Sequence, residues 1–208
     1  MFHQSTQNDD IESRNKYSSA RWRSLYRQHM EIRQMKTSDL TTLHKICCDA
    51  YCQNFAEHWE HGGLEYYIDN VFGIEILKTE LSDKNLQYYA AFINEEPVAF
   101  MKINLSSNLP GLDKERGVEL EKVYVLPQFK GKKIGKSLLD VAFDIAKSKK
   151  KEIFWLSVID TNKEAISFYE KAGFRFHSKT RLEYPKFKEE LKGVWRMYFE
   201  LSYDLGKK

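Results

Sequence analysis

The segment GVELEKVYVLPQFKGKKIGKSLL, residues 117–139, is the most informative stretch of this chain. Its first part, Val118 to Val125, is rich in β-branched and aromatic residues and stops just before Pro127, which predicts a strand ending at the proline. From Ile134 onward the apolar residues follow helical spacing. The segment therefore predicts a strand, a basic glycine-containing turn and a helix, in that order.

The turn between these two elements, QFKGKKIG, has the features of an anion site. Free backbone N–H groups and the positive end of a helix dipole converge at such a turn, which suits a phosphate or pyrophosphate. Gly131 allows close backbone approach, and the lysines supply positive charge. A purely structural turn is the alternative. Neither the phosphate loop of nucleoside triphosphatases nor the dinucleotide pattern G-x-G-x-x-G is present.

The turn resembles the acetyl-CoA loop of the GNAT family of N-acetyltransferases, whose pattern is [Q/R]-x-x-G-x-[G/A]. Gln128 and Gly131 match this pattern, whereas Lys133 stands where the family has Gly or Ala. A second match lies downstream, where NKEAISFYEKAGF, residues 162–174, is similar to the family signature N-x-x-A-x-x-F-Y-x-x-x-G-F. The resemblance implies acetyl-CoA as the co-substrate.

Length and composition favour one domain. The chain has 208 residues, of which 42% are hydrophobic, enough to bury one sizeable core. Residues 1–29 are polar with little periodicity and are predicted to be a poorly ordered N-terminal extension to a domain at 30–208. The formal net charge of +3 is too small to indicate nucleic-acid binding. No apolar run reaches the length of about 18 residues that crosses a bilayer, so no membrane association is expected.

Three cysteines, Cys47, Cys48 and Cys52, cluster in one segment with helical spacing. Their odd number and their proximity argue against a disulfide framework, so a reduced, cytoplasmic protein is predicted. A zinc site on the face shared by Cys48 and Cys52 is the alternative to a plain core helix. No metal is expected, because His58 and His61 lack a third placed ligand.

The remaining patterns predict a mixed sheet. Runs of β-branched and aromatic residues predict seven strands, at 30–35, 86–93, 98–105, 118–125, 152–159, 174–182 and 194–201. Helical spacing predicts helices at 37 to about 59, 64–72, 74–81, 134 to about 147, and 163–172, the last with a Thr161–Glu164 capping box. This order predicts an α/β fold with helices on both faces of the sheet. It is also the order of the GNAT fold, and the resemblance covers residues 30 to about 202.

Acetyl transfer to an amine needs a base, because an alkylamine with a pKa of about 10.4 is mostly protonated at neutral pH. Glu119 and Glu121 lie two residues apart on the predicted strand and so point to the same face. Members of the GNAT family carry a catalytic glutamate at one or the other of these positions, so the resemblance implies that either residue is the base. The alternative is that both are polar residues on a half-exposed face.

The resemblance implies further roles at the coenzyme. The backbone amides of Val123 and Val125 would hold the oxyanion, and Tyr169 would be the general acid toward the coenzyme sulfur. The other implied coenzyme contacts are Tyr124, Gln128, Lys130, Gly131, Lys132, Lys133, Ile134, Gly135, Lys136, Asn162 and Lys171. A core aromatic is the alternative for Tyr169, and a helix cap is an additional role for Asn162.

Acidic residues and a subgroup resemblance bear on the acceptor. Glu57 and Glu60 lie beside the Gly62-Gly63 break, where a carboxylate cluster would attract a polycation; an ordinary solvated helix junction is the alternative. The runs LEKVYV at 120–125 and WLSV at 155–158 resemble bacterial spermidine/spermine acetyltransferases of the PaiA type, which implies that Trp155 lies in the acceptor site.

The predicted function is acetyl-CoA-dependent transfer to a primary amine of a small molecule, with a polyamine favoured. Two alternatives stay open. One is a non-catalytic acyl-CoA-binding regulator, suggested by Lys133 and by the basic run at 147–151. The other is a peptide or protein N-acetyltransferase. The oligomeric state is also open, a homodimer included.

Overall fold

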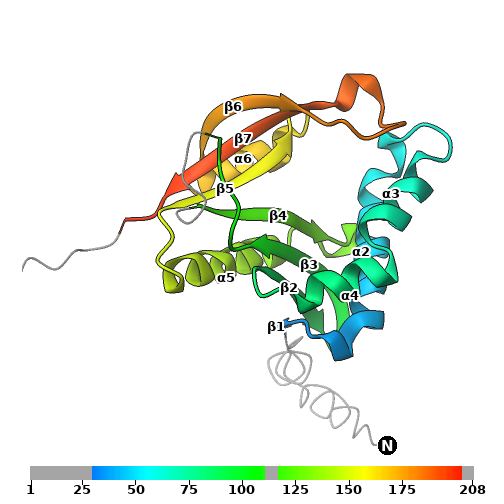
Figure 1. Cartoon of the computed structure of the whole chain (residues 1–208), viewed down its shortest axis with the longest axis horizontal. Coiled ribbons are helices and arrows are strands. Elements are labelled where there is room, and N and C mark those ends of the chain that lie inside the picture. The colour runs from blue at the N-terminus through cyan, green and yellow to red at the C-terminus, as the bar shows by residue number, and fades with distance from the viewer. Residues whose placement is uncertain (1–29, 111–116, 203–208) are drawn as a thin grey trace, which may run out of the picture.

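Strand β4, Gly117–Val125, lies in the middle of a seven-stranded sheet with the order β1-β2-β3-β4-β5-β7-β6 (Figure 1). This computed structural model describes residues 30–110 and 117–202, so the predicted extension at 1–29 lies outside the described residues. The other strands are β1 (Met30–Gln34), β2 (Leu86–Ile93), β3 (Glu96–Asn104), β5 (Ile153–Ile159), β6 (Arg175–Arg181) and β7 (Gly193–Glu200). The predicted mixed α/β sheet of about seven strands is confirmed.

Within the described ranges the α-helices are α2 (Leu40–Phe55), α3 (Gly63–Val71), α4 (Ile74–Ser82), α5 (Ile134–Ser148) and α6 (Lys163–Lys171). Short 3₁₀ helices are η2 (Thr37–Asp39), η3 (Ala56–His58), η4 (Pro127–Phe129) and η5 (Glu189–Leu191). The predicted capping box is wrong. Asn162, one residue after Thr161, occupies the N-cap of α6, and its side-chain oxygen accepts a hydrogen bond from the Ala165 amide at 3.0 Å. The asparagine side chain thus accepts from a backbone N–H that has no partner within the helix, which is the role predicted for Thr161.

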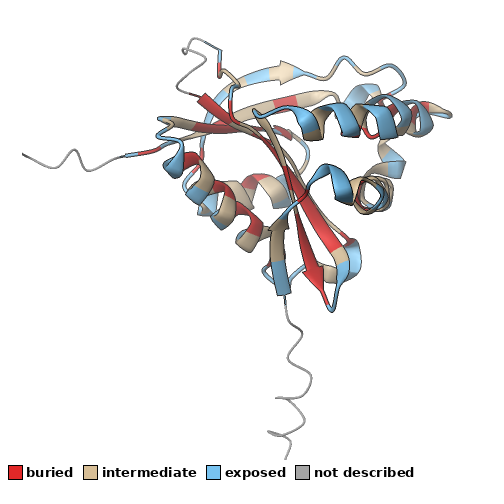
Figure 2. Ribbon diagram, turned by 60° about the horizontal axis from the view of Figure 1, so that its bottom comes forward, coloured by how far each residue is buried: buried red, intermediate tan, exposed pale blue. Residues whose placement is uncertain are grey.

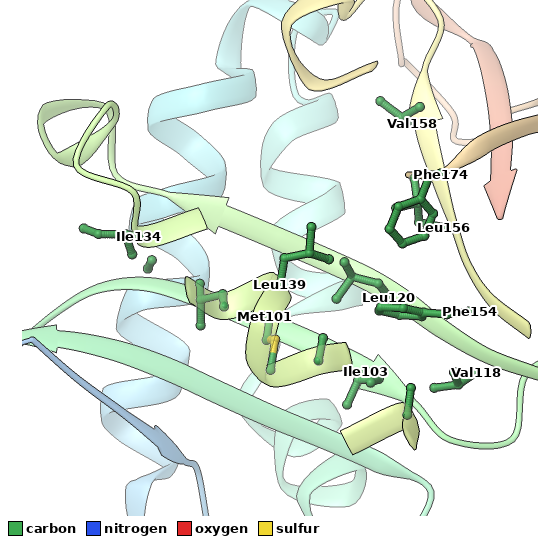
Figure 3. Packing of buried hydrophobic residues seen from close by; sticks show 14 of the residues in the cluster. Met101, Ile103, Val118, Leu120, Ile134, Leu139, Phe154, Leu156, Val158 and Phe174 are labelled. Atoms are coloured by element: carbon green, nitrogen blue, oxygen red, sulfur yellow. The ribbon is translucent and has the colours of Figure 1, made fainter. Parts of the chain in front are cut away.

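The buried side chains form two clusters, one on each face of the sheet. Met101 and Leu120 pack with Leu139 of α5 on one face, where Figure 3 shows the three side by side. On the other face Phe100 packs with Leu77 of α4, in the cluster that also contains the buried side of α2. Figure 2 shows burial concentrated in the central strands and exposure on the outer sides of the helices. The alternation along β3 explains why neighbouring residues serve different clusters.

The strands β4 and β5 pair in parallel over only part of their length. Their register joins Gly117–Leu120 to Ile153–Leu156 and continues no further toward the carboxyl ends of the strands (Figure 1). All other neighbouring strands of the sheet pair antiparallel. The last part of β4 therefore has β3 on one edge and no strand hydrogen-bonded to the other.

Candidate active site

A cavity of about 1000 Å³ lies where β4 and β5 diverge. Its walls come from both strands, the turn after β4, the first turn of α5, helix α6, the second half of α2, helix α3, and the connection between β6 and β7 with the start of β7. A cavity of this volume can hold a drug-sized ligand. The divergence of the strands thus opens the sheet at its centre.

The backbone amides of Val123 and Val125 face this opening. Leu126 donates its backbone N–H to the Val98 carbonyl at 3.0 Å, which identifies a hydrogen-bonded pair between β4 and β3. Because hydrogen-bonded and non-hydrogen-bonded pairs alternate along an antiparallel ladder, the amides of Val123 and Val125 point away from β3. The Val125 carbonyl on that edge accepts a hydrogen bond from the Asn54 side chain at 2.9 Å.

The turn after β4 presents a run of free amides to the cavity. The backbone N–H groups of residues 131–136 have no hydrogen-bond partner among the residues that the structure describes, and no side chain caps α5. Gly131 has a φ of 75°, and Lys133, the N-cap of α5, has a φ of 64°. Lys133 thus adopts a left-handed backbone, which costs a residue with a side chain about 1 kcal/mol.

The two glutamates of β4 point to one face but have different partners. The Ser107 hydroxyl donates to Glu119 at 2.6 Å. Glu121 forms an ion pair with Lys102 at 2.7 Å and accepts a hydrogen bond from the Asn104 side chain at 3.0 Å. The β3–β4 register passes from Lys102–Lys122 to Ile103–Leu120, so Glu121 is the extra residue of a bulge. The bulge turns Glu121 toward the buried lysine of β3.

A buried network extends from Glu121 to helix α4. Lys102 is 6% exposed, and its ammonium lies 2.6 Å from Glu80 as well as 2.7 Å from Glu121. The hydroxyl of Tyr88 completes the network by donating to Glu80. A buried charge is tolerated only when it is paired, and Lys102 meets this condition twice. Glu121 is therefore held in a structural network.

These surroundings shift the carboxyl pKa values in opposite directions. Burial raises the pKa of Glu119, against the hydrogen bond from Ser107. Burial also acts to raise the pKa of Glu121, but the charges of Lys102 and Lys122 and the hydrogen bonds outweigh it, so that the pKa lies below its ordinary value. A carboxylate with a raised pKa is the stronger base. Glu119 is thus better suited to accept a proton than Glu121.

Tyr169 of α6 contributes to the cavity lining. Its ring packs against Phe168, with a centroid separation of 5.1 Å, and against Phe174, at 5.8 Å. Burial raises the pKa of Tyr169 to about 12, so the phenol stays protonated through the neutral and mildly alkaline range. The Tyr169 side chain can therefore act as a hydrogen-bond donor in the cavity.

Most of the predicted site residues come together in this cavity. Those in its lining are Glu119, Glu121, Val123, Tyr124, Val125, Lys130, Gly131, Lys133, Ile134, Gly135, Lys136, Asn162 and Tyr169. Six predicted residues are not in the lining: Gln128, Lys132 and Lys171, and on the acceptor side Glu57, Glu60 and Trp155. Trp155 is buried and donates its indole N–H to the Ser107 carbonyl at 3.3 Å, whereas the other five are exposed. The roles of all the predicted site residues, in the lining or outside it, stay predictions.

Several lining residues were missed by the sequence analysis. They include Asn54, His58 and a group of aromatic side chains outside β4, namely Tyr51, Phe55, Tyr67, Tyr184 and Phe187. The spacing of Tyr51 and Phe55, four residues apart at the end of a predicted helix, was the available signal. It indicated a shared face but not that this face borders a cavity.

The described part of the chain contains no helix long and apolar enough to cross a bilayer, and no group of three potential metal ligands. All three cysteines are free, as expected from their spacing.

A sheet opened at its centre, with free amides beside a helix N-terminus, defines an α/β protein with a site suited to a phosphate-bearing ligand. The chain belongs to the acetyltransferase (GNAT) family, whose profile matches residues 44–174. Members of this family use acetyl-CoA, and the chain is an N-acetyltransferase.

Relatives and solved structures agree with this assignment. The chain is 28% identical over 150 residues to spermidine N(1)-acetyltransferase from Thermoplasma acidophilum, covering 70% of this chain and 88% of that protein. The fold resembles PaiA N-acetyltransferase from T. acidophilum in complex with coenzyme A, with a TM-score of 0.67 at 24% identity over 83% of this chain and 99% of that one. A variant of spermidine N-acetyltransferase from Vibrio cholerae gives a TM-score of 0.60 at 17% identity, over 82% of this chain and 93% of that one.

Proposed function

We propose that this protein transfers the acetyl group of acetyl-CoA to a primary amine of a small molecule, and that a polyamine is the favoured acceptor. The observation that carries the proposal is the run of unpartnered amides at residues 131–136, beside an edge of β4 that no strand covers. Unpartnered amides at a helix N-terminus favour binding of an anion. The diphosphate of the coenzyme is an anion that these amides could bind.

The coenzyme would lie along the open edge of β4. Its diphosphate would accept hydrogen bonds from the amides of the turn, with Lys130, Lys133 and Lys136 nearby to offset its charge. Its pantetheine arm would take the place of the missing strand, because an extended chain with amide groups can pair with a free strand edge. The thioester carbonyl would then accept from the amide of Val123 or Val125, where negative charge develops during the reaction.

Proton transfer is assigned to two side chains. Glu119 would remove a proton from the acceptor ammonium, directly or through a water molecule, and the neutral nitrogen would attack the thioester carbon. The C–N bond forms, the C–S bond breaks, and the coenzyme thiolate takes a proton from Tyr169, which recovers one from the nitrogen. The proton that Glu119 took from the ammonium passes on to solvent, so the nitrogen loses two protons in all. Glu121 would shape the site through Lys102 without accepting a proton.

The preference for a polyamine rests on relatives and on charge. Proteins named for spermidine acetyltransfer are similar to this chain in sequence and in fold. Outside the cavity lining, the exposed carboxylates of Glu57 and Glu60 lie on either side of the lining residue His58 in the sequence, where they would attract a polycation. Trp155 would contribute indirectly, through its hydrogen bond to the loop that holds Glu119.

The test is release of free thiol from acetyl-CoA in the presence of spermidine, spermine, aminoglycosides, amino acids or short peptides. Turnover with polyamines is expected. Turnover with peptides and with no other amine would show that the acceptor is a protein N-terminus or a lysine side chain and not a polyamine. Coenzyme binding with no acetylated product from any amine would identify a regulator.

A further inference from the structure

Six aromatic side chains form part of the cavity lining, which we call the aromatic wall. They come from four separate parts of the chain: Tyr51 and Phe55 from α2, Tyr67 from α3, Tyr124 from β4, and Tyr184 and Phe187 from the connection between β6 and β7. Rings from such distant segments meet only because the fold brings them to one place. Their common surroundings are the carboxyl end of β4 and the acceptor side of the site.

The rings of the wall pack against one another. Tyr51 stacks on Tyr67 with a centroid distance of 4.2 Å, and on Phe55 at 5.0 Å. Tyr124 meets Phe55 edge to face at 5.1 Å, and Tyr184 meets Tyr67 in the same way, also at 5.1 Å. Phe187 packs instead against Trp59, at a centroid distance of 4.9 Å. Contacts of this kind fix the orientation of each ring, so the wall is a preformed surface. Tyr51, Tyr67 and Phe187 are buried, so a ligand beside the wall would mainly meet the half-buried rings of Phe55, Tyr124 and Tyr184.

The aromatic wall has no net charge, but the faces of its rings can still attract a cation. Burial raises the pKa of Tyr51, Tyr67 and Tyr124 above the ordinary phenol value, so these hydroxyls keep their protons. Burial and the charge of Lys188 lower the pKa of His58, so its imidazole does not add positive charge at neutral pH. The faces of such rings carry partial negative charge, which attracts a cation.

Charged groups of β4 and its network lie near the wall, as does Lys188, whose charge acts on His58. Lys122 also contributes to the cavity lining, and its ammonium lies 6.0 Å from the centroid of the Phe72 ring, in the field of Glu121 and Glu80. With Glu119 and Lys102, these five groups sum to a single negative charge when all are ionised. This charge suits one ammonium at the reacting end, so a second ammonium needs a different kind of partner.

We propose that the aromatic wall binds the methylene chain and the remote ammonium of a diamine or polyamine whose other nitrogen is acetylated beside Glu119. This inference rests on the proposed function and gives the acceptor a second recognition element. The aromatic faces supply the attraction that a carboxylate would otherwise supply, and the ring edges cover the methylene groups.

The experiment compares 1,4-diaminobutane with n-butylamine, two acceptors of equal chain length that differ in the remote ammonium. The kcat/KM value is expected to be about ten times higher for the diamine, because a cation beside desolvated aromatic rings typically gains binding free energy of that order. Tyr184→Leu removes one ring from the wall, and Tyr184→Phe retains it. The ratio of the two kcat/KM values is expected to fall several-fold in Tyr184→Leu and to persist in Tyr184→Phe.

Tyr66→Leu is the matched control, because Tyr66 is an exposed tyrosine of α3, 45% accessible and not part of the cavity lining. It should leave the ratio unchanged. Melting temperatures of all variants show whether each one is folded. A ratio near one in the unaltered protein, or an equal loss for both amines in Tyr184→Leu, would overturn the inference.

Calorimetric titration of the protein loaded with coenzyme A tests the wall without turnover. The diamine should bind more tightly than n-butylamine, and Tyr184→Leu should remove the difference. If the protein shows this binding preference but transfers no acetyl group, the proposed function is wrong and the proposed role of the aromatic wall in binding the diamine still holds. Equal binding of the two amines would reject the wall, whatever the enzyme acetylates.

Discussion

The side-chain amide of Asn54, in the last turn of α2, donates to the backbone carbonyl of Val125 at 2.9 Å and to the Ala50 carbonyl at 2.7 Å. The first of these bonds joins residues 71 positions apart in the chain and satisfies a carbonyl that the divergence of β4 from β5 leaves without a strand partner. Asn54 thus holds the open end of β4 against the helix that carries part of the aromatic wall.

Asn54→Ala removes this support. The end of β4 should become less ordered, so the Kd for coenzyme A is expected to rise about three- to tenfold, while the free energy of unfolding falls by about 1 kcal/mol. Asn70→Ala is the control, because the Asn70 side chain donates to the backbone carbonyl of Tyr66 within α3 and has no hydrogen bond to β4 among the described residues. Calorimetry and urea denaturation measure the two effects. Equal coenzyme affinity in both variants would contradict the role given to Asn54.

Gly135→Asp tests the anion site at the start of α5. A Cβ at Gly135 would meet its nearest neighbour, Val125 Cγ2, at 3.8 Å, an ordinary contact, so the substitution should be compatible with the fold. Its carboxylate would lie beside the diphosphate, and the Kd for coenzyme A is expected to rise at least about tenfold through charge repulsion. Gly135→Asn has the same shape without the charge. If the two variants bind equally, charge at this turn does not matter to the coenzyme.

Tyr169→Phe removes the proposed acid and keeps the ring. The value of kcat should fall about 100-fold, in the range typical of a lost general acid, with the coenzyme Kd nearly unchanged. Because the pKa of Tyr169 is about 12, the unaltered protein should show no alkaline loss of kcat from this group below about pH 11. Tyr198→Phe on β7, outside the cavity lining, is the control. Unchanged turnover in Tyr169→Phe would remove Tyr169 from the mechanism.

Glu119→Gln tests the choice of base. Because burial raises the pKa of Glu119, kcat of the unaltered protein should fall as the pH drops through this raised value, when the carboxylate gains a proton. The variant should be at least about 100-fold slower at pH 8 and should lack this acid limb. Single-turnover rates between pH 5 and pH 9 give both results. An acid limb that persists in Glu119→Gln would assign the base elsewhere.

Glu121→Gln should act mainly on stability. The folded-state pKa of Glu121 lies below its ordinary value, so its carboxylate stabilises the fold above that ordinary value, and the contribution is lost as the pH falls through the folded-state pKa. At pH 7 the variant should lose about 3 kcal/mol, because Lys102 keeps only one partner, and the deficit should shrink in strongly acidic buffer.

Urea denaturation at pH 7 and pH 3.5 measures this deficit for Glu121→Gln. Glu75→Gln is the control, because Glu75 forms an exposed bridge to Lys78 at 3.5 Å that should contribute less than about 1 kcal/mol. A deficit of the same size at both pH values would show that the charge of Glu121 is not what stabilises the fold.

The local patterns of the sequence determined the elements of this protein and the coenzyme turn. The strand β2 was predicted at its observed bounds, and β4, the turn and α5 followed from β-branched residues, Pro127 and helical spacing. These features depend on neighbours within about four residues, which is the range that strand and helix periodicity reports. The same period placed Glu119 and Glu121 on one face.

Only the tertiary structure decided which partners Glu119 and Glu121 have. Lys102 of β3 and Glu80 of α4 engage Glu121, while Ser107 contacts Glu119, so packing between distant segments separates two glutamates that the sequence leaves equivalent. The aromatic wall has the same origin, since its members span residues 51 to 187. Hydrogen-bond partners and burial depend on which segments the sheet brings together, and no pattern within one segment contains that information.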